Sequence, residues 1–270
     1  MTGTRDWKSS ARGAITLFVL GMVGVIAIAI YSVPALREIP ELSTLSYPTL
    51  VLLASLNSTI LLVVFVALGT VTAPRIDLNC HVFAWASGGT PNWSEIRESL
   101  PLAAALGAGL FVVVAILDVA FSQFTEFPII DSPTDADALS DLFASIPMRL
   151  FYGGITEEIL VRWGFMAPVA YALWWGRNRL GDATETPSET IMWVAIAVSA
   201  VVFGVGHLPA LASTSGLTTP LIVRTVVLNA IVGVGFGWLF WRRSLETAMI
   251  AHATFHVALV AVSTVVILVT

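Results

Sequence analysis

The sequence predicts an all-α protein, a polytopic bundle of transmembrane helices. Of its 270 residues, 57% are hydrophobic and only 11% are charged. Soluble domains carry about 25% charged residues, so this chain has too few charges to cover the surface of a water-soluble globule. The abundance of apolar side chains equally excludes a disordered chain. Together with the long apolar runs described next, these numbers indicate an integral membrane protein.

The apolar runs are long enough to cross a membrane, since a helix needs about 20 mainly apolar residues to span about 30 Å of hydrocarbon. In chain order, the candidate spans are Gly13–Val33, Thr49–Val71, Leu102–Phe121, Leu150–Trp175, Ile191–Ala212, Leu221–Trp241 and Leu245–Val269. The fourth is the weakest, because a Gly-Gly pair and three charged residues interrupt it. A broken or re-entrant helix is its alternative. We therefore expect about seven spans, with eight as the upper count.

The distribution of Lys and Arg predicts the orientation of the chain. Nine basic residues fall in alternate connections, and the opposite connections hold Arg37 alone. Because basic residues concentrate in cytoplasmic loops, we expect a multi-pass cell-membrane protein with a cytoplasmic amino terminus. The first span is too long for a signal peptide and no cleavage site follows it, so we interpret it as an uncleaved anchor. The net charge of −5 gives no basic surface for nucleic acid, and the lipid bilayer is the expected environment.

Ionisable residues inside the spans are the candidates for function, because charge in hydrocarbon is costly. They are Asp118, Glu157, Glu158, Arg162, His207, Arg224, His252 and His256. We expect Asp118 and Arg224 to pair across helices or to bond to backbone. Gly233 and Gly237 form a G-x-x-x-G that would allow close helix packing. Cys80, the one cysteine, lies in an expected loop and is given no role.

The two consecutive glutamates should have different roles. Glu157 and Glu158 differ by about 100° around a helix, so they cannot point the same way. Glu158 and Arg162 lie at i and i+4 on one face, in the favourable order of acid before base. This pattern predicts a structural ion pair for Glu158 and leaves Glu157 free to face a cavity. The alternative is that both carboxylates belong to one stabilising network.

The histidines can meet Glu157 in one half of the membrane. His252 and His256 are also at i and i+4, with their rings on one helix face, and His207 lies near the end of its span. At about 1.5 Å per residue, all three lie at a depth similar to that of Glu157. A carboxylate beside several imidazoles is typical of general base catalysis. The alternative is that these histidines only form hydrogen bonds between helices.

Two of these patterns resemble motifs of a known family. The segment Glu157-Glu158-Ile-Leu-Val-Arg162 resembles the E-E-x-x-x-R motif of the CAAX protease and bacteriocin-processing family of intramembrane proteases. The segment Phe203-Gly-Val-Gly-His207 resembles the F-x-x-x-H motif of that family. Each motif is common by itself, but their order and their positions on separate spans make the resemblance specific.

The last motif of the family, H-x-x-x-N, is similar to His252-Ala-Thr-Phe-His256, with His256 in the place of the asparagine. The resemblance covers residues 149–262 and implies a multi-helix fold around an internal catalytic cavity. It also implies peptide hydrolysis without a covalent enzyme intermediate. Carried over, Glu157 activates a water with help from His207, and His252 stabilises the oxyanion. An imidazole at position 256 can still donate a hydrogen bond in that role.

A metal site is the alternative use of the same histidines. The H-x-x-x-H spacing is that of zinc-binding helices, and His207 or Glu157 would complete a site with His252 and His256. The usual zinc-protease pattern needs Glu directly after the first His, and Ala253 occupies that position. We therefore expect no cofactor, with zinc as the less favoured alternative.

The sequence thus predicts an intramembrane endopeptidase that acts on membrane-associated or lipidated peptides. Residues 1–145 would supply amino-terminal helices and loops, and residues 146–270 the catalytic core, within one embedded unit. The expected partners are a peptide or protein substrate and the bilayer. The alternative class is a non-enzymatic membrane protein, either a scaffold or immunity protein or a proton-coupled carrier.

Overall fold

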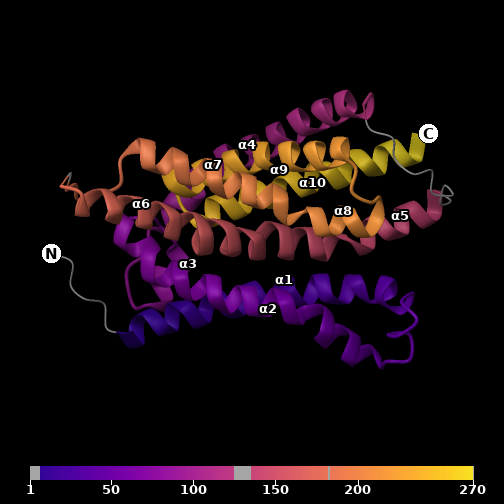
Figure 1. The fold of residues 1–270 in the computed structure, drawn as a ribbon, viewed down its shortest axis with the longest axis horizontal. Helices are drawn as coiled ribbons and strands as arrows, with labels where there is room; N and C mark the ends of the chain where they lie inside the picture. Colours follow the sequence, from indigo (N-terminus) through magenta and orange to yellow (C-terminus); the bar gives the residue numbers. More distant parts are fainter. Residues whose placement is uncertain (1–6, 125–134, 182, 270) are drawn as a thin grey trace.

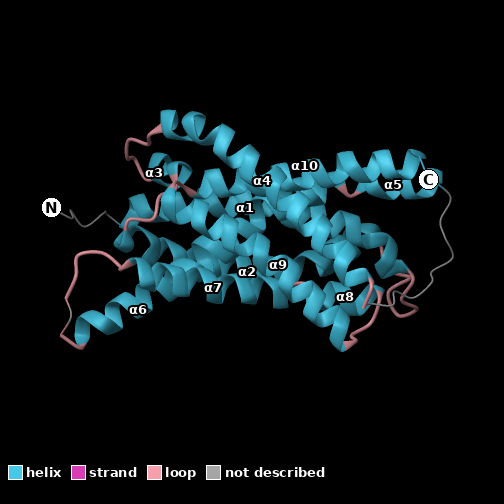
Figure 2. Cartoon of the chain, turned by 90° about the horizontal axis from the view of Figure 1, so that it is seen from above, coloured by secondary structure: helices cyan, strands magenta, loops and turns pink. Residues whose placement is uncertain are grey.

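The protein is helical throughout the residues that the computed structural model describes, which are 7–124, 135–181 and 183–269 (Figure 2). In chain order the helices are α1 (Trp7–Arg37), α2 (Tyr47–Thr72), η1 (Ala73–Ile76), α3 (His81–Ala86), α4 (Trp93–Ser122), α5 (Asp135–Ala144), η2 (Met148–Glu157), η3 (Ile159–Met166), α6 (Ala167–Arg179), α7 (Glu189–Gly206), α8 (Leu208–Thr214), α9 (Thr219–Arg242) and α10 (Leu245–Val269). The predicted polytopic helical bundle is confirmed.

Six stretches are long and apolar enough to cross a membrane, by length and composition. They correspond to all the expected spans except the fourth, which contains Glu157, Glu158 and Arg162. That fourth segment is nevertheless helical, because η2, η3 and α6 follow one another with helical backbone at Glu158 and Ala167. Its first two parts have hydrogen bonds of the π-helix type, a geometry often found at functional sites.

The expected fifth span is one of the six, but it is not a single straight helix. His207 caps the end of α7, with its backbone N–H bonded to the carbonyls of Gly204 and Val205, and α8 begins at the next residue. Pro209 explains the break, since proline has no N–H and favours the first turn of a new helix. The break leaves the His207 ring at the end of α7.

The helix formed by η2, η3 and α6 lies in the middle of the bundle (Figure 1). On one side, the α1–α2 pair packs against η2 and η3. On the other side, α10 packs against η2 and α4, and α7 pairs with α9. Trp163 of η3 is 1% exposed, which places the fourth expected span at the core of the protein.

Two expected contacts between helices are confirmed. A Cβ atom at Gly233 would lie 2.9 Å from the Cα of Ala200, so the G-x-x-x-G of α9 does allow close packing against α7. Arg224 of α9 forms an ion pair with Asp118 of α4. Both contacts hold α9 against its neighbours.

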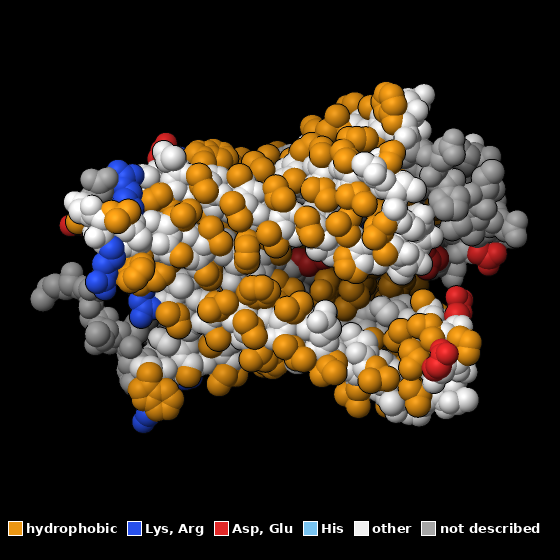
Figure 3. Space-filling model, in the orientation of Figure 1, with side chains coloured by type: hydrophobic (Ala, Val, Ile, Leu, Met, Phe, Trp, Pro, Cys, Tyr) orange, Lys and Arg blue, Asp and Glu red, His pale blue; other side chains and the backbone are white. Residues whose placement is uncertain are grey.

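The outer surface is that of a membrane protein. Hydrophobic side chains cover the sides of the bundle, Lys and Arg gather at one end, and most of the visible Asp and Glu lie toward the other (Figure 3). Large apolar residues are widely exposed on these sides, for example Leu52 at 70% and Ile116 at 65%. Such exposure is unfavourable in water but suits contact with lipid.

Candidate functional site

Glu158, Arg162 and His252 form a buried charged triad at the contact between the central helix and α10. The Glu158 Oε2 lies 3.1 Å from the Arg162 Nε, which confirms the expected ion pair, and both side chains are fully buried. The other oxygen, Oε1, lies 2.8 Å from the Nδ1 of His252. Because an ionised carboxylate can only accept hydrogen bonds, Nδ1 carries the proton in this pair.

Glu157 has a different environment from Glu158, as the sequence predicts. Its side chain is 19% exposed, and its Oε2 lies 3.9 Å from the Nε2 of His252. The His252 ring therefore stands between the two glutamates, hydrogen-bonded to one and facing the other. The space-filling view shows a hollow between the two halves of the bundle, in which an acidic side chain is visible (Figure 3).

Phe203 connects His207 to this group. The His207 Nδ1 lies 2.8 Å from the Phe203 carbonyl oxygen. The two rings meet edge to face, with centroids 4.7 Å apart, and the Phe203 centroid lies 6.0 Å from that of His252. The Arg162 guanidinium carbon lies 4.9 Å from the Phe203 centroid. The aromatic residue of the F-x-x-x-H segment thus packs among the charged residues.

His256 extends the group along α10. Its ring stacks on that of His252 with centroids 5.0 Å apart and an interplanar angle of 23°. Its Nδ1 is buried, and no described residue forms a hydrogen bond with it. Gly153 of η2 makes room for this ring, since a Cβ atom there would lie 2.5 Å from the His256 Nε2.

The structure therefore brings together the residues that the sequence singles out. Glu157, His252 and His256 form a continuous series of contacts, and His207 joins them through Phe203. Within the described part of the chain, no group of three or more His, Cys, Asp or Glu side chains is arranged to hold a metal ion.

Several contacts of the site were not predicted from the sequence. The Glu158–His252 hydrogen bond joins residues 94 positions apart. The Arg162 Nη2 donates to the carbonyl oxygen of Gly233, at 3.2 Å. Phe236, three residues further along α9, stacks on His252 with centroids 4.6 Å apart. The close packing of Gly233 could be expected from its G-x-x-x-G pattern, but nothing in that pattern points to Arg162.

A tyrosine near the site was also missed. Tyr152 lies on η2, and its hydroxyl is 3.4 Å from the Oγ of Ser58 on α2. It is close enough for the Glu157 charge to act on it. No motif marks this residue, and only its position five residues before Glu157 could have drawn attention to it.

These observations define a polytopic helical membrane protein with a buried carboxylate–imidazole site. Comparison with family models gives a match over residues 139–258 to type II CAAX prenyl endopeptidase Rce1-like proteins. The match contains all three motifs and confirms that residues 139–258 resemble the CAAX protease and bacteriocin-processing family of intramembrane proteases. Comparisons with curated proteins and with solved structures gave no significant match.

Proposed function

We propose that this protein hydrolyses a peptide bond of a membrane-associated or lipidated peptide with a water activated at Glu157. The observation that carries the proposal is the contrast between the two consecutive glutamates. Glu158 is fully buried and paired, whereas Glu157 is partly exposed and faces an imidazole nitrogen at 3.9 Å. A general base has to reach its substrate, and only Glu157 of the two can do so.

In this mechanism, Glu157 takes a proton from the attacking water, assisted by His207. The water oxygen bonds to the scissile carbonyl carbon, whose oxygen becomes the oxyanion. The proton can pass from Glu157 to the Nε2 of His252, because Glu158 holds that ring by its Nδ1–H. His252 and His256 then donate to the oxyanion, and the proton leaves on the departing amine. The products are a carboxylic acid and an amine, with no covalent enzyme intermediate.

The principal test is hydrolysis by Glu157→Gln, which keeps the shape of the side chain but not its basicity. We expect a loss of about 10²-fold or more in kcat, the scale of general base catalysis. Glu189→Gln is the matched control, because Glu189 is 72% exposed and pairs with Arg242 at the surface. Purified protein and a quenched-fluorescent prenylated peptide would provide the measurement, and size-exclusion chromatography would check folding.

The same assay separates the alternatives. Full activity of Glu157→Gln would overturn the proposal. A chelator should leave hydrolysis unchanged, and a loss that added zinc restores would instead support a metal held by the histidines. A scaffold protein would show no hydrolysis, and its cellular phenotype would survive the Glu157→Gln change.

A further inference from the structure

Two hydroxyl groups near Glu157 take no part in the mechanism proposed above. The Tyr152 hydroxyl of η2 lies 3.4 Å from the Oγ of Ser58 on α2. This distance is longer than the usual separation of about 2.7–2.8 Å between two hydroxyl oxygens, so the contact is weak. Neither side chain forms another hydrogen bond within the described part of the chain. Because each hydroxyl has one donor and two acceptor positions, this hydroxyl pair keeps one O–H to donate to a ligand.

Ser58 differs from the neighbouring hydroxyl residues of its helix. The Ser55 hydroxyl donates to the Leu52 carbonyl at 2.9 Å, and the Thr59 hydroxyl donates to the Ser55 carbonyl at 2.8 Å. Serine and threonine within a helix can satisfy their hydroxyls in this way, on the backbone of the preceding turn. Ser58 makes no such bond in α2, which the structure describes in full, and its hydroxyl faces Tyr152 instead. The hydroxyl pair therefore joins two helices beside the site.

The π-type backbone of η2 places Tyr152 next to Glu157. Hydrogen bonds of this type join residues five apart, which is the separation of Tyr152 and Glu157, so the two lie on nearly the same helix face. In an α-helix, residues five apart point about 140° away from each other. The Tyr152 hydroxyl is close enough for the Glu157 charge to act on it. The distorted segment thus presents a hydroxyl and the proposed base to the same space.

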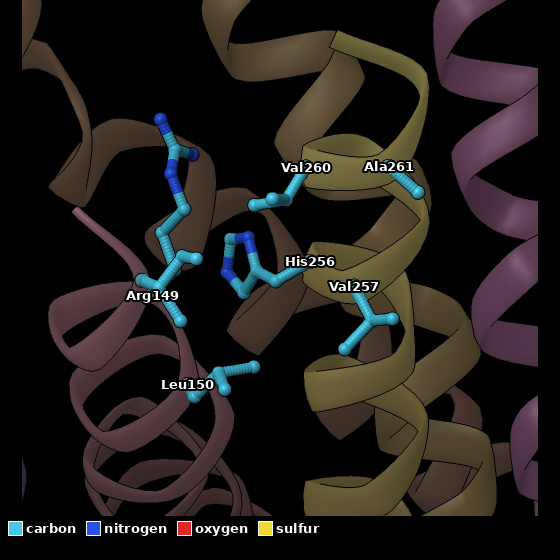
Figure 4. Close-up of a pocket in the computed structure, with 7 residues that line it drawn as sticks. Arg149, Leu150, His256, Val257, Val260 and Ala261 are labelled. Atoms are coloured by element: carbon cyan, nitrogen blue, oxygen red, sulfur yellow. The ribbon is translucent and has the colours of Figure 1, made fainter. Parts of the chain in front are cut away.

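The imidazoles lie on the other side of Glu157. The Glu157 Oε2 lies 3.9 Å from the Nε2 of His252. Figure 4 shows His256 pointing from α10 toward the start of η2. Apart from His256 and Arg149, the residues that line the cavity there, of about 260 Å³, are aliphatic. Glu157 therefore has the imidazoles of α10 on one side and the hydroxyl pair on the side of α2.

A peptide substrate in this site needs hydrogen-bond partners for its main chain. No water is available in the hydrocarbon to bond its N–H and C=O groups, and leaving one of them unpaired is costly. When the peptide is extended, the main-chain groups beside the scissile bond face the walls of the site. Aliphatic side chains offer them no partner, whereas a hydroxyl can donate to a carbonyl oxygen or accept from an N–H. The hydroxyl pair is therefore suited to an extended main chain rather than to a particular side chain.

We propose that the Tyr152 hydroxyl binds a main-chain carbonyl oxygen of the substrate next to the scissile bond. Ser58 donates to the Tyr152 oxygen and thereby directs the Tyr152 proton to the peptide, since hydrogen bonds in such a chain strengthen one another. Tyr152 is thus a substrate-binding residue, and Ser58 is a positioning residue that acts through it. This inference rests on the proposed function and adds how the substrate is held. The contact raises the affinity for a peptide whatever its side chains are.

The first test measures hydrolysis of a prenylated, quenched-fluorescent peptide by Tyr152→Phe. We expect KM to rise about 3- to 10-fold, the effect of one neutral hydrogen bond, and kcat to stay at the wild-type value. Ser58→Ala should change KM in the same direction by a smaller factor. Tyr171→Phe and Ser55→Ala are the matched controls, because the Tyr171 ring packs against Trp174 of α6 and the Ser55 hydroxyl bonds within α2. A fall in kcat without a change in KM would overturn the inference, since it would place Tyr152 in the chemical step.

A series of ester analogues distinguishes substrate binding from a merely structural role. In each peptide, one amide bond beside the scissile bond is replaced by an ester, whose carbonyl is a weaker acceptor. For one of these esters, wild type should show a higher KM and Tyr152→Phe should raise it little further, whereas Tyr152→Phe should keep its full effect on the other esters. The same effect of Tyr152→Phe on every peptide would show that the residue only supports the fold, and it would overturn the inference.

Binding to Glu157→Gln separates this inference from the proposed function. That variant keeps the shape of the site and should not hydrolyse, so the fluorescence anisotropy of the same peptides, carrying one fluorophore, reports binding alone. An added Tyr152→Phe change should weaken binding by about 3- to 10-fold, again except for one ester. Unchanged binding, with hydrolysis intact in wild type, would overturn the inference alone. The expected loss of binding, without hydrolysis by wild type, would overturn the proposed function alone.

Discussion

Glu158 and Glu246 are both buried carboxylates at contacts of α10, but they are stabilised in different ways. Glu158 is 0% exposed and has two ionisable partners, Arg162 and His252. Glu246 is 8% exposed, and among the described residues it has no ion pair. Instead, its Oε1 accepts hydrogen bonds from the Val82 backbone N–H, at 2.8 Å, and from the Cys80 thiol, at 3.3 Å.

The difference indicates which buried charge can take part in chemistry. The partners of Glu158 include an imidazole, and that imidazole faces the more accessible Glu157, so a proton can move through this group. The main partner of Glu246 is a peptide N–H near the beginning of α3, which exchanges no proton during a reaction. Glu246 thus joins α3 to the first turn of α10 by hydrogen bonds. We expect substitution of Glu246 to lower the stability of the fold and to leave hydrolysis unchanged.

The largest effect is expected for Arg162→Met. This change leaves the Glu158 carboxylate buried with only His252 beside it, and removing one partner of a buried ion pair costs about 3–5 kcal/mol. The contacts of the guanidinium with Phe203 and with the Gly233 carbonyl are lost as well. We expect a large fall in thermal stability in detergent and loss of hydrolysis.

A second variant shows whether the charge itself is responsible. In Glu158→Gln/Arg162→Met both charges are removed, so this protein should be more stable than Arg162→Met alone. Hydrolysis should remain low, because His252 no longer has a charged partner. Wild-type stability of Arg162→Met would show that Glu158 does not depend on its arginine, and the contrast with Glu246 would fail.

A smaller effect is expected for Glu246→Ala. It leaves the Val82 N–H and the Cys80 thiol without their acceptor, which should cost about 1–3 kcal/mol of unfolding free energy. Glu246→Gln should cost less, because its amide oxygen can still accept from Val82. The kcat per folded molecule should stay at the wild-type value in both variants. A tenfold fall in kcat would instead connect Glu246 to the catalytic group.

The sequence was informative where the interaction is local. The Glu158–Arg162 pair follows from i, i+4 spacing, and the apolar spans follow from composition, so both were predicted. The hydrogen bond from His252 to Glu158 depends on how two distant helices rotate against each other, which spacing along one helix does not determine.

The local distortions of the backbone were also beyond the sequence. The π-type segment η2 also contacts a distant helix, for example through Thr156, whose hydroxyl donates to the Gly21 carbonyl of α1 at 2.7 Å. The sequence predicts no role for Cys80, because its partner Glu246 lies 166 residues away. In each case the missing information was the position of a neighbouring helix.

The smallest effect concerns Cys80, which lies outside the membrane-spanning segments. Burial, and then the Glu246 charge, raise the pKa of this thiol well above its ordinary value. Only the thiolate reacts with iodoacetamide, so we expect very slow alkylation of the folded protein at pH 7–8. Glu246→Gln should react faster because one of the two causes of the raised pKa is removed. Equal rates in the two proteins would show that burial alone controls the thiol.

The raised pKa of Cys80 also makes a small contribution to the free energy of unfolding. The folded protein holds the thiol proton to higher pH than the unfolded chain, whose cysteine pKa is about 8.5. The contribution is therefore complete below that pH and decreases as the pH rises above it. Unfolding free energies of wild type and Cys80→Ala should differ by a constant amount up to about pH 8.5 and approach each other at higher pH. A difference that widened with pH would mean that the folded protein stabilises the thiolate, contrary to the position of Cys80 beside a carboxylate.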